Sequence, residues 1–172
     1  MIICYEARLR LMKRVYDYSM GFNVPEFSEA IDNLIKRPPE TLYEVMLFSV
    51  LFLYFEETGC ERARTLGDID RLYFPYYKND IKNGISSDTL DDLFRYFFMH
   101  FTAAKRFAEQ PFTIGGCDKD GKDRSNELTM RILEIYDYAR KYMAENGNPH
   151  QWGDEGHPKK AVLEKDIEEG IS

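Results

Sequence analysis

Cysteine, histidine and net positive charge are all scarce in this sequence. Its 172 residues include three cysteines and three histidines, and 30 acidic against 23 basic residues give a net charge of -7. Cys4, Cys60 and Cys117 are widely spaced, so they fit neither a disulfide framework nor a zinc pattern and favour a reducing, cytoplasmic setting. The acidic balance removes the electrostatic argument for binding nucleic acid or an anionic membrane.

A long apolar run is also missing. The longest, from Val45 to Phe55, is interrupted by Ser49 and falls well short of the ~20 residues that span a bilayer. No secretory signal is expected, because the first residues run at once into Glu6 and Arg8. A hydrophobic fraction of 44% with 15% aromatics is instead typical of one globular domain with a core.

Helical periodicity covers most of the chain. Apolar residues recur at helical spacing in five segments, at about residues 6–20, 25–35, 88–104, 126–147 and 159–169. A sixth helix is expected at about 38–58, where the continuous apolar run predicts burial on most of its faces. Strand signals are few, and the clearest is the short apolar run Phe112 to Ile114. The sequence therefore predicts a mostly α-helical fragment of an α/β fold, with five to seven helices and one or two short strands.

The stretch from Pro111 to Thr129 predicts a strand, a tight turn and a helix start. Its apolar run meets Gly115 and Gly116, which permit backbone conformations closed to other residues. A polar turn follows, and Ser125 or Asn126 can cap the next helix. This is the geometry of a strand that leads into a helix in an α/β protein.

The same stretch contains a candidate nucleophile and a candidate phosphate-binding loop, but the spacing of its residues supports neither. Cys117 follows two glycines upstream of a helix start, where a thiolate could be stabilised, but no histidine lies nearby to act as base. A small residue packed beside a turn is the simpler interpretation. The glycines match neither the dinucleotide-binding nor the phosphate-loop pattern.

The acidic residues and histidines of the sequence do not have the spacing of a known metal site. A calcium loop needs oxygen ligands at its first, third and fifth positions and glycine at its sixth. Counted from Asp118, the fifth position is Lys122 and glycine comes fourth, so the acids of this stretch predict a solvated turn: Asp118, Asp120, Asp123 and Glu127. His150, Asp154 and His157 match no metal spacing, and His100 beside an aromatic stripe suits a core boundary. The sequence predicts no catalytic, cofactor-binding or metal-binding residue.

Two motifs resemble the large domain of glycyl radical enzymes, the pyruvate formate-lyase-like family. The segment 67–80 is similar to the family's Gly-Arg-x-Asp-x-x-x-x-Pro-Tyr-Tyr-x-x-Asp, with Asp68 where arginine is common. The segment 113–129 is similar to its Thr-x-Gly-Gly-x-x-x-x-Gly-x-Asp-x-x-Asn-Glu-Leu-Ser/Thr, and 38–44 to its Pro-Pro-x-Thr-x-x-Glu. The motif residues expected to have structural roles are Asp70, Pro75, Tyr76, Tyr77, Asp80, Gly115, Gly116, Gly121 and Asn126.

The resemblance covers residues 1–135 as a partial domain and implies much about the parent enzymes. They fold as a ten-stranded α/β barrel and cleave C–C, C–O or C–N bonds of small-molecule substrates. Formate acetyltransferases and dehydratases are examples, and the family includes lyases and transferases of anaerobic metabolism. A glycyl radical installed by a partner radical-SAM activase makes a thiyl radical on an active-site cysteine. The regions that carry this glycine and cysteine in the family are not in this chain, and the family usually has an apolar residue where Cys117 stands. The resemblance thus implies a fragment without its own cofactor, inactive alone.

The tail, residues 136–172, departs from that family. Its segments 136–154 and 166–170 look like the N-terminal region of GNAT-type N-acetyltransferases, although the acetyl-CoA-binding loop of that family is absent. Three functions stay open: a truncated glycyl radical enzyme, a non-enzymatic helical interaction module that self-associates through exposed apolar faces, and an acyltransferase fusion fragment. The substrate subgroup is not predicted.

Overall fold

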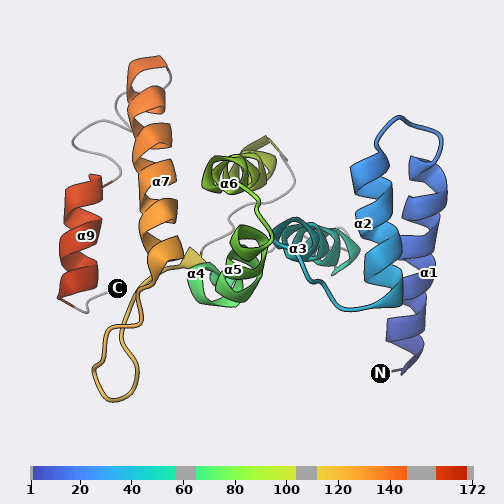
Figure 1. The fold of residues 1–172 in the computed structure, drawn as a ribbon, viewed down its shortest axis with the longest axis horizontal. Helices are drawn as coiled ribbons and strands as arrows, with labels where there is room; N and C mark the ends of the chain where they lie inside the picture. The colour runs from blue at the N-terminus through green and yellow to red at the C-terminus, as the bar shows by residue number, and fades with distance from the viewer. Residues whose placement is uncertain (1, 57–64, 104–111, 147–157, 170–172) are drawn as a thin grey trace. The chain divides into compact units, whose positions relative to one another are not determined.

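The computed structural model describes residues 2–56, 65–103, 112–146 and 158–169, and the chain divides into two compact units, residues 1–61 and 62–172. The described residues form eight helices and two short strands (Figure 1), which confirms the predicted mostly helical class. The number of helices among the described residues is one above the expected five to seven. The reason is that residues 69–82, expected only as an aromatic cluster, form two short helices. No helix among the described residues is long and apolar enough to cross a membrane.

The first unit consists of α1 (Ile2–Ser19), α2 (Pro25–Lys36) and α3 (Leu42–Glu56). Helices α1 and α2 pack against each other across a short turn. Proline stands at the first position of α2, where its missing N–H costs no hydrogen bond. The buried hydroxyl groups of Ser19 and Ser28 hydrogen-bond at 2.7 Å, so the end of α1 is fixed to the first turn of α2.

Helix α3 starts later than its proline pair suggests. Thr41 caps it, because its Oγ1 accepts a hydrogen bond from the N–H of Glu44 at 3.2 Å. The Glu44 side chain, only 4% exposed, turns back and accepts hydrogen bonds from four donors at 2.8–2.9 Å: two Arg37 guanidinium nitrogens, the Asn33 amide and the Glu40 N–H. One carboxylate therefore ties α2, the connecting turn and α3 together.

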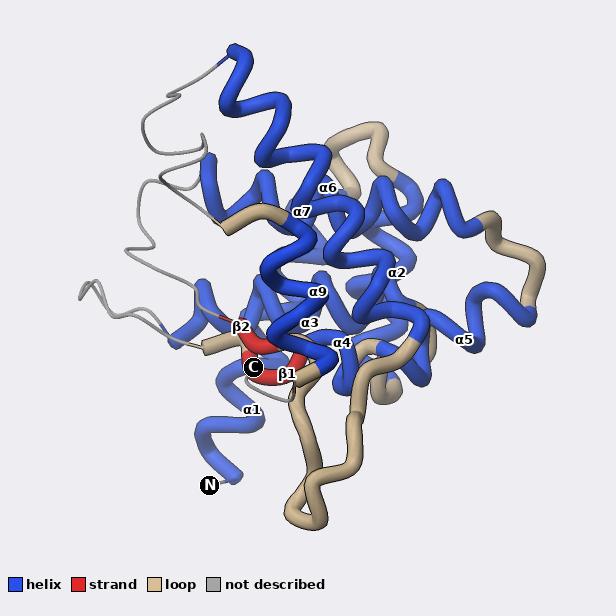
Figure 2. The backbone as a smooth tube through the Cα atoms, turned by 90° about the vertical axis from the view of Figure 1, so that its left-hand side faces the viewer, coloured by secondary structure: helices blue, strands red, loops and turns tan. Residues whose placement is uncertain are grey.

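The second unit contains β1 (Gly67–Asp68), α4 (Ile69–Leu72), α5 (Phe74–Lys82), α6 (Ser87–Ala103), β2 (Phe112–Thr113), α7 (Glu127–Asn146) and α9 (Lys160–Glu168). The strands lie side by side and are parallel, with Gly67 opposite Phe112 and Asp68 opposite Thr113 (Figure 2). The chain leaves both strands at the same edge, so the segments after β1 and β2 meet there.

The core of the second unit is built from α4 to α7. Its most deeply buried side chains are Ile69, Tyr77, Leu90, Phe94, Leu128, Ile132 and Leu133. The Tyr73 ring contacts Phe94 and Phe97, with centroids 6.4 and 5.9 Å apart. Phe94 and Phe97 lie on α6, the helix whose sequence has an aromatic stripe beside His100. This core holds α4 and the start of α7 in place.

Candidate functional site

Asp70 lies just past β1, in the first turn of α4, and is 0% exposed. Its Oδ2 accepts a hydrogen bond from the N–H of Gly115 at 2.8 Å and another from the hydroxyl of Thr129 at 2.6 Å. Burying a carboxylate costs free energy unless hydrogen-bond donors face it, so these two hydrogen bonds allow Asp70 to be buried. One side chain thus joins the first motif to both halves of the second.

Asn126 completes this cluster as the N-cap of α7. Its Oδ1 accepts hydrogen bonds from the N–H groups of Leu128 at 2.9 Å and Thr129 at 3.3 Å, which have no partner within the helix. Its Nδ2 donates to the backbone oxygen of Asp70 at 3.1 Å, and its own N–H donates to Thr129 Oγ1 at 2.9 Å. The cap therefore fixes the start of α7 directly onto α4.

Gly115 and Gly116 lie between the strand and the helix, as predicted. Both are buried and have φ values of 71° and 81°, in the left-handed region that favours glycine. This conformation points the Gly115 N–H at Asp70, and the Gly116 oxygen accepts the N–H of Arg124 at 2.9 Å. The glycine pair closes the base of the loop and completes the Asp70 cluster, meaning Asp70, Gly115, Asn126 and Thr129.

Beyond the glycines, residues 117–123 form a hairpin that extends away from the helices of its unit (Figure 1). Asp118 Oδ1 accepts the N–H groups of Asp120 at 2.9 Å and Lys122 at 3.0 Å, while Gly121 takes a φ of 74°. The acidic side chain here orders a turn. Cys117 is exposed at the start of this hairpin.

The Pro-Tyr-Tyr motif forms the first turn of α5. Pro75 stands in that turn, as the missing N–H allows, and the Tyr77 side chain is buried below it. The Tyr77 hydroxyl donates to Glu127 Oε1 at 3.1 Å, which links the first motif to the second a further time. Burial, followed by the Glu127 charge, raises the pKa of Tyr77, so the hydroxyl stays a donor. Tyr76 is half-buried and Asp80 is buried at the end of α5.

One partly buried ion pair was not predicted from the sequence. Arg131 of α7 binds Asp91 of α6 with two contacts, Nε to Oδ1 at 3.2 Å and Nη2 to Oδ2 at 2.9 Å. Burial raises the pKa of Asp91, and the charge of Arg131 opposes that shift only in part. The pair fixes α6 against α7, and no local sequence pattern marks it because 40 residues separate its members.

The geometry of the two motifs agrees with comparisons to known proteins. A model of the pyruvate formate lyase-like family matches residues 6–144. The chain belongs to this family. A solved glycyl radical enzyme from Archaeoglobus fulgidus is similar in structure, with a TM-score of 0.58 and 26% identity, and the match covers 77% of this chain and 20% of that one. A search of curated proteins found no match.

In this pyruvate formate lyase-like chain the structure brings together three of the predicted motif residues, Asp70, Gly115 and Asn126, with Gly116 adjacent. Gly121 lies apart in the exposed hairpin. Thr129 and Glu127 contact the first motif. Thr129 was not singled out from the sequence, and Glu127, expected in the solvated turn, is instead the first residue of α7. A signal for Thr129 was present, since Asn-x-x-Thr at a helix start is a pattern of reciprocal capping.

Other candidate residues do not assemble into a site. No group of three or more His, Cys, Asp or Glu side chains that could hold a metal ion occurs among the described residues. His100 lies on α6, and burial lowers its pKa. Cys60, His150, Asp154 and His157 are outside the described residues.

The tail packs onto the family domain. Helix α7 continues without a break across the predicted boundary at 135/136, and α9 packs against it. The Tyr136 hydroxyl donates to the oxygen of Pro158 at 3.0 Å. The division into 1–135 and 136–172, and the likeness of the tail to acetyltransferases, stay predictions.

Proposed function

We propose that this chain is a scaffold segment of a glycyl radical enzyme, inactive alone. The Asp70 cluster is the observation that carries the proposal. Both motifs of the family meet in it, and the hydrogen bonds of its side chains go to backbone groups or to each other. Groups used in this way position a loop and a helix; they are not free to transfer hydrogen to a substrate.

The strands support the same proposal. A parallel pair of two residues per strand is too small to be an independent sheet, and parallel sheets occur almost only within larger α/β folds. The chain spans about 20% of the length of the Archaeoglobus enzyme. The remaining barrel strands, the small-molecule substrate site, the active-site cysteine and the radical-bearing glycine belong, in this proposal, to other parts of the parent enzyme.

Cys117 directly follows the glycine pair in the sequence, and its exposed position argues against a radical role. It is exposed on the hairpin, and its backbone pairs with Asp123. A thiyl radical that abstracts hydrogen from a substrate requires a site that excludes water and competing reactions. An exposed turn offers no such enclosure.

The proposal is tested by electron paramagnetic resonance. The chain is incubated without oxygen with a radical-SAM activase, S-adenosylmethionine and reductant, beside a full-length glycyl radical enzyme treated in the same way. We expect the doublet of a glycyl radical from the full-length enzyme and none from this chain. A doublet from this chain would show that it holds a radical site and would overturn the proposal.

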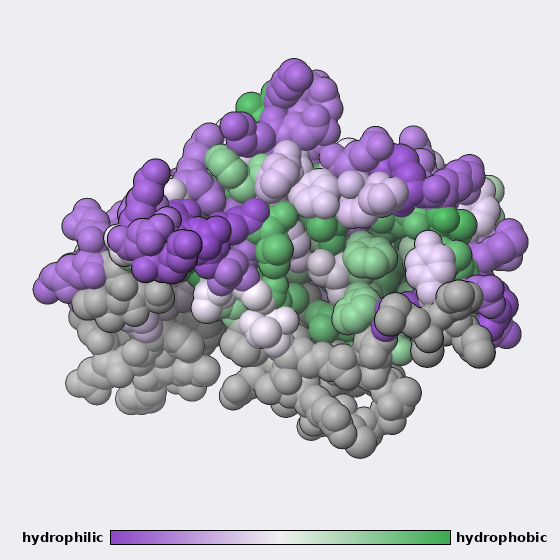
Figure 3. Space-filling model, turned by 90° about the horizontal axis from the view of Figure 1, so that it is seen from below, coloured by the Kyte–Doolittle hydropathy of each residue, from purple (hydrophilic) through white to green (hydrophobic). Residues whose placement is uncertain are grey.

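Exposed apolar side chains favour a second candidate, a non-enzymatic helical interaction module. Tyr96 and Met99 of α6 are 70% and 61% exposed, Tyr138 of α7 is 62% exposed, and Figure 3 shows apolar side chains reaching the surface. Such surfaces favour association, including self-association. Size-exclusion chromatography with light scattering tests this, because a monomer that binds no apolar dye would contradict it.

A further inference from the structure

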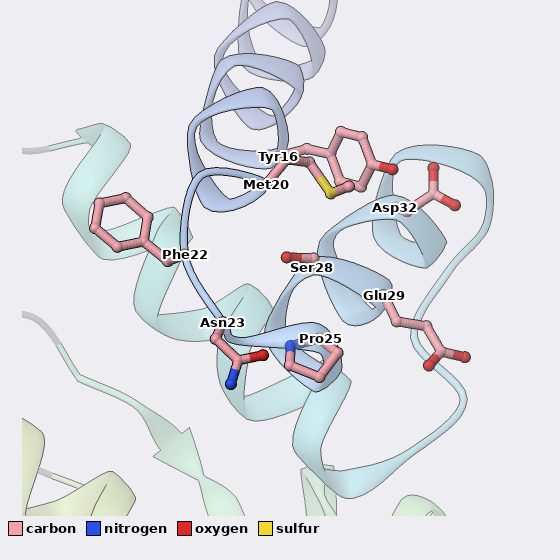
Figure 4. A pocket seen from close by; sticks show the side chains of 8 residues that line it. All are labelled: Tyr16, Met20, Phe22, Asn23, Pro25, Ser28, Glu29 and Asp32. Carbon is pink, nitrogen blue, oxygen red and sulfur yellow. The ribbon is translucent and has the colours of Figure 1, made fainter.

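We draw no further inference here: the strongest candidate, the pocket at the turn between α1 and α2 (Figure 4), carries nothing because nothing among the described residues shows what would occupy it.

Discussion

Asp70 connects three segments of the second unit. Its carboxylate is fully buried and accepts from Gly115 and Thr129, so a substitution affects three segments at once. Its other oxygen, Oδ1, is buried without a hydrogen-bond partner among the described residues. The two oxygens therefore differ in role, and that difference can be measured by substitution.

Asp70→Ala should lower the free energy of unfolding by about 2–5 kcal/mol, because it leaves two buried donors unpaired. Asp70→Asn should cost less, about 1–2 kcal/mol, because the amide oxygen can still accept from both donors. Urea unfolding measures both values, with Asp120→Ala in the exposed hairpin as the control, expected within about 0.5 kcal/mol of the parent. Equal losses from Ala and Asn would contradict the assigned roles of the two oxygens.

Glu44 has a corresponding place in the first unit, and its effect depends on pH. Burial alone would raise its pKa, but hydrogen bonds from Arg37, Glu40 N–H and Asn33 outweigh burial and lower it. A lowered folded-state pKa means that the carboxylate stabilises the fold above its unfolded pKa of about 4.3. That contribution is lost as the pH falls through the folded-state pKa.

The Glu44→Gln variant should therefore be less stable than the parent by about 1–3 kcal/mol at neutral pH. The difference in stability should narrow as the pH falls below the unfolded-state pKa of about 4.3 and through the lowered folded-state pKa of Glu44. Urea unfolding of both proteins from pH 7 to pH 3 measures it, with the exposed Glu40→Gln as a control that should change little. A gap that stays constant over this range would be inconsistent with a charged Glu44 in the fold.

At the scale of elements, the start of α7 is where sequence and structure agree best. The capping pattern predicted a helix from Ser125 or Asn126, and α7 begins at Glu127 with Asn126 as its cap. Strand β1 and helices α4 and α5 were missed as elements. Strand β1 has two residues and pairs with β2, so its hydrogen bonds come from a segment about 45 residues away that no local period can reveal.

Asn126→Ala should lower the free energy of unfolding by about 1–2 kcal/mol through loss of the cap. Asn126→Ala also removes the donor to the Asp70 carbonyl. Asn126→Asp keeps the cap but not this donor, so it should lose only part of that free energy of unfolding. Asn146→Ala at the other end of α7 is a matched control, since its amide donates to the backbone oxygen of Tyr142 in an exposed position. A similar loss from both ends would mean that the cap at Asn126 has no special importance.

At the scale of the molecule, family membership followed from motif order and spacing, while the way the motifs meet did not. Spacing along the chain located Asp70, Gly115 and Asn126 separately. Only the fold shows that a carboxylate in one motif accepts from an amide in the other, because contacts between residues 45 and 59 positions apart depend on the packing of α4 against α7. The ion pair of Asp91 with Arg131 was hidden for the same reason.

The central claim is that the two motifs form one buried scaffold around Asp70. Amide hydrogen exchange, measured by NMR over the whole chain, tests it most directly. The N–H of Gly115 should exchange as slowly as the core amides of α7 at Ile132 and Leu133, because its acceptor is fully buried. It should lose that protection in Asp70→Ala. Exchange at Gly115 in the parent protein at the rate of an unstructured peptide would contradict the account.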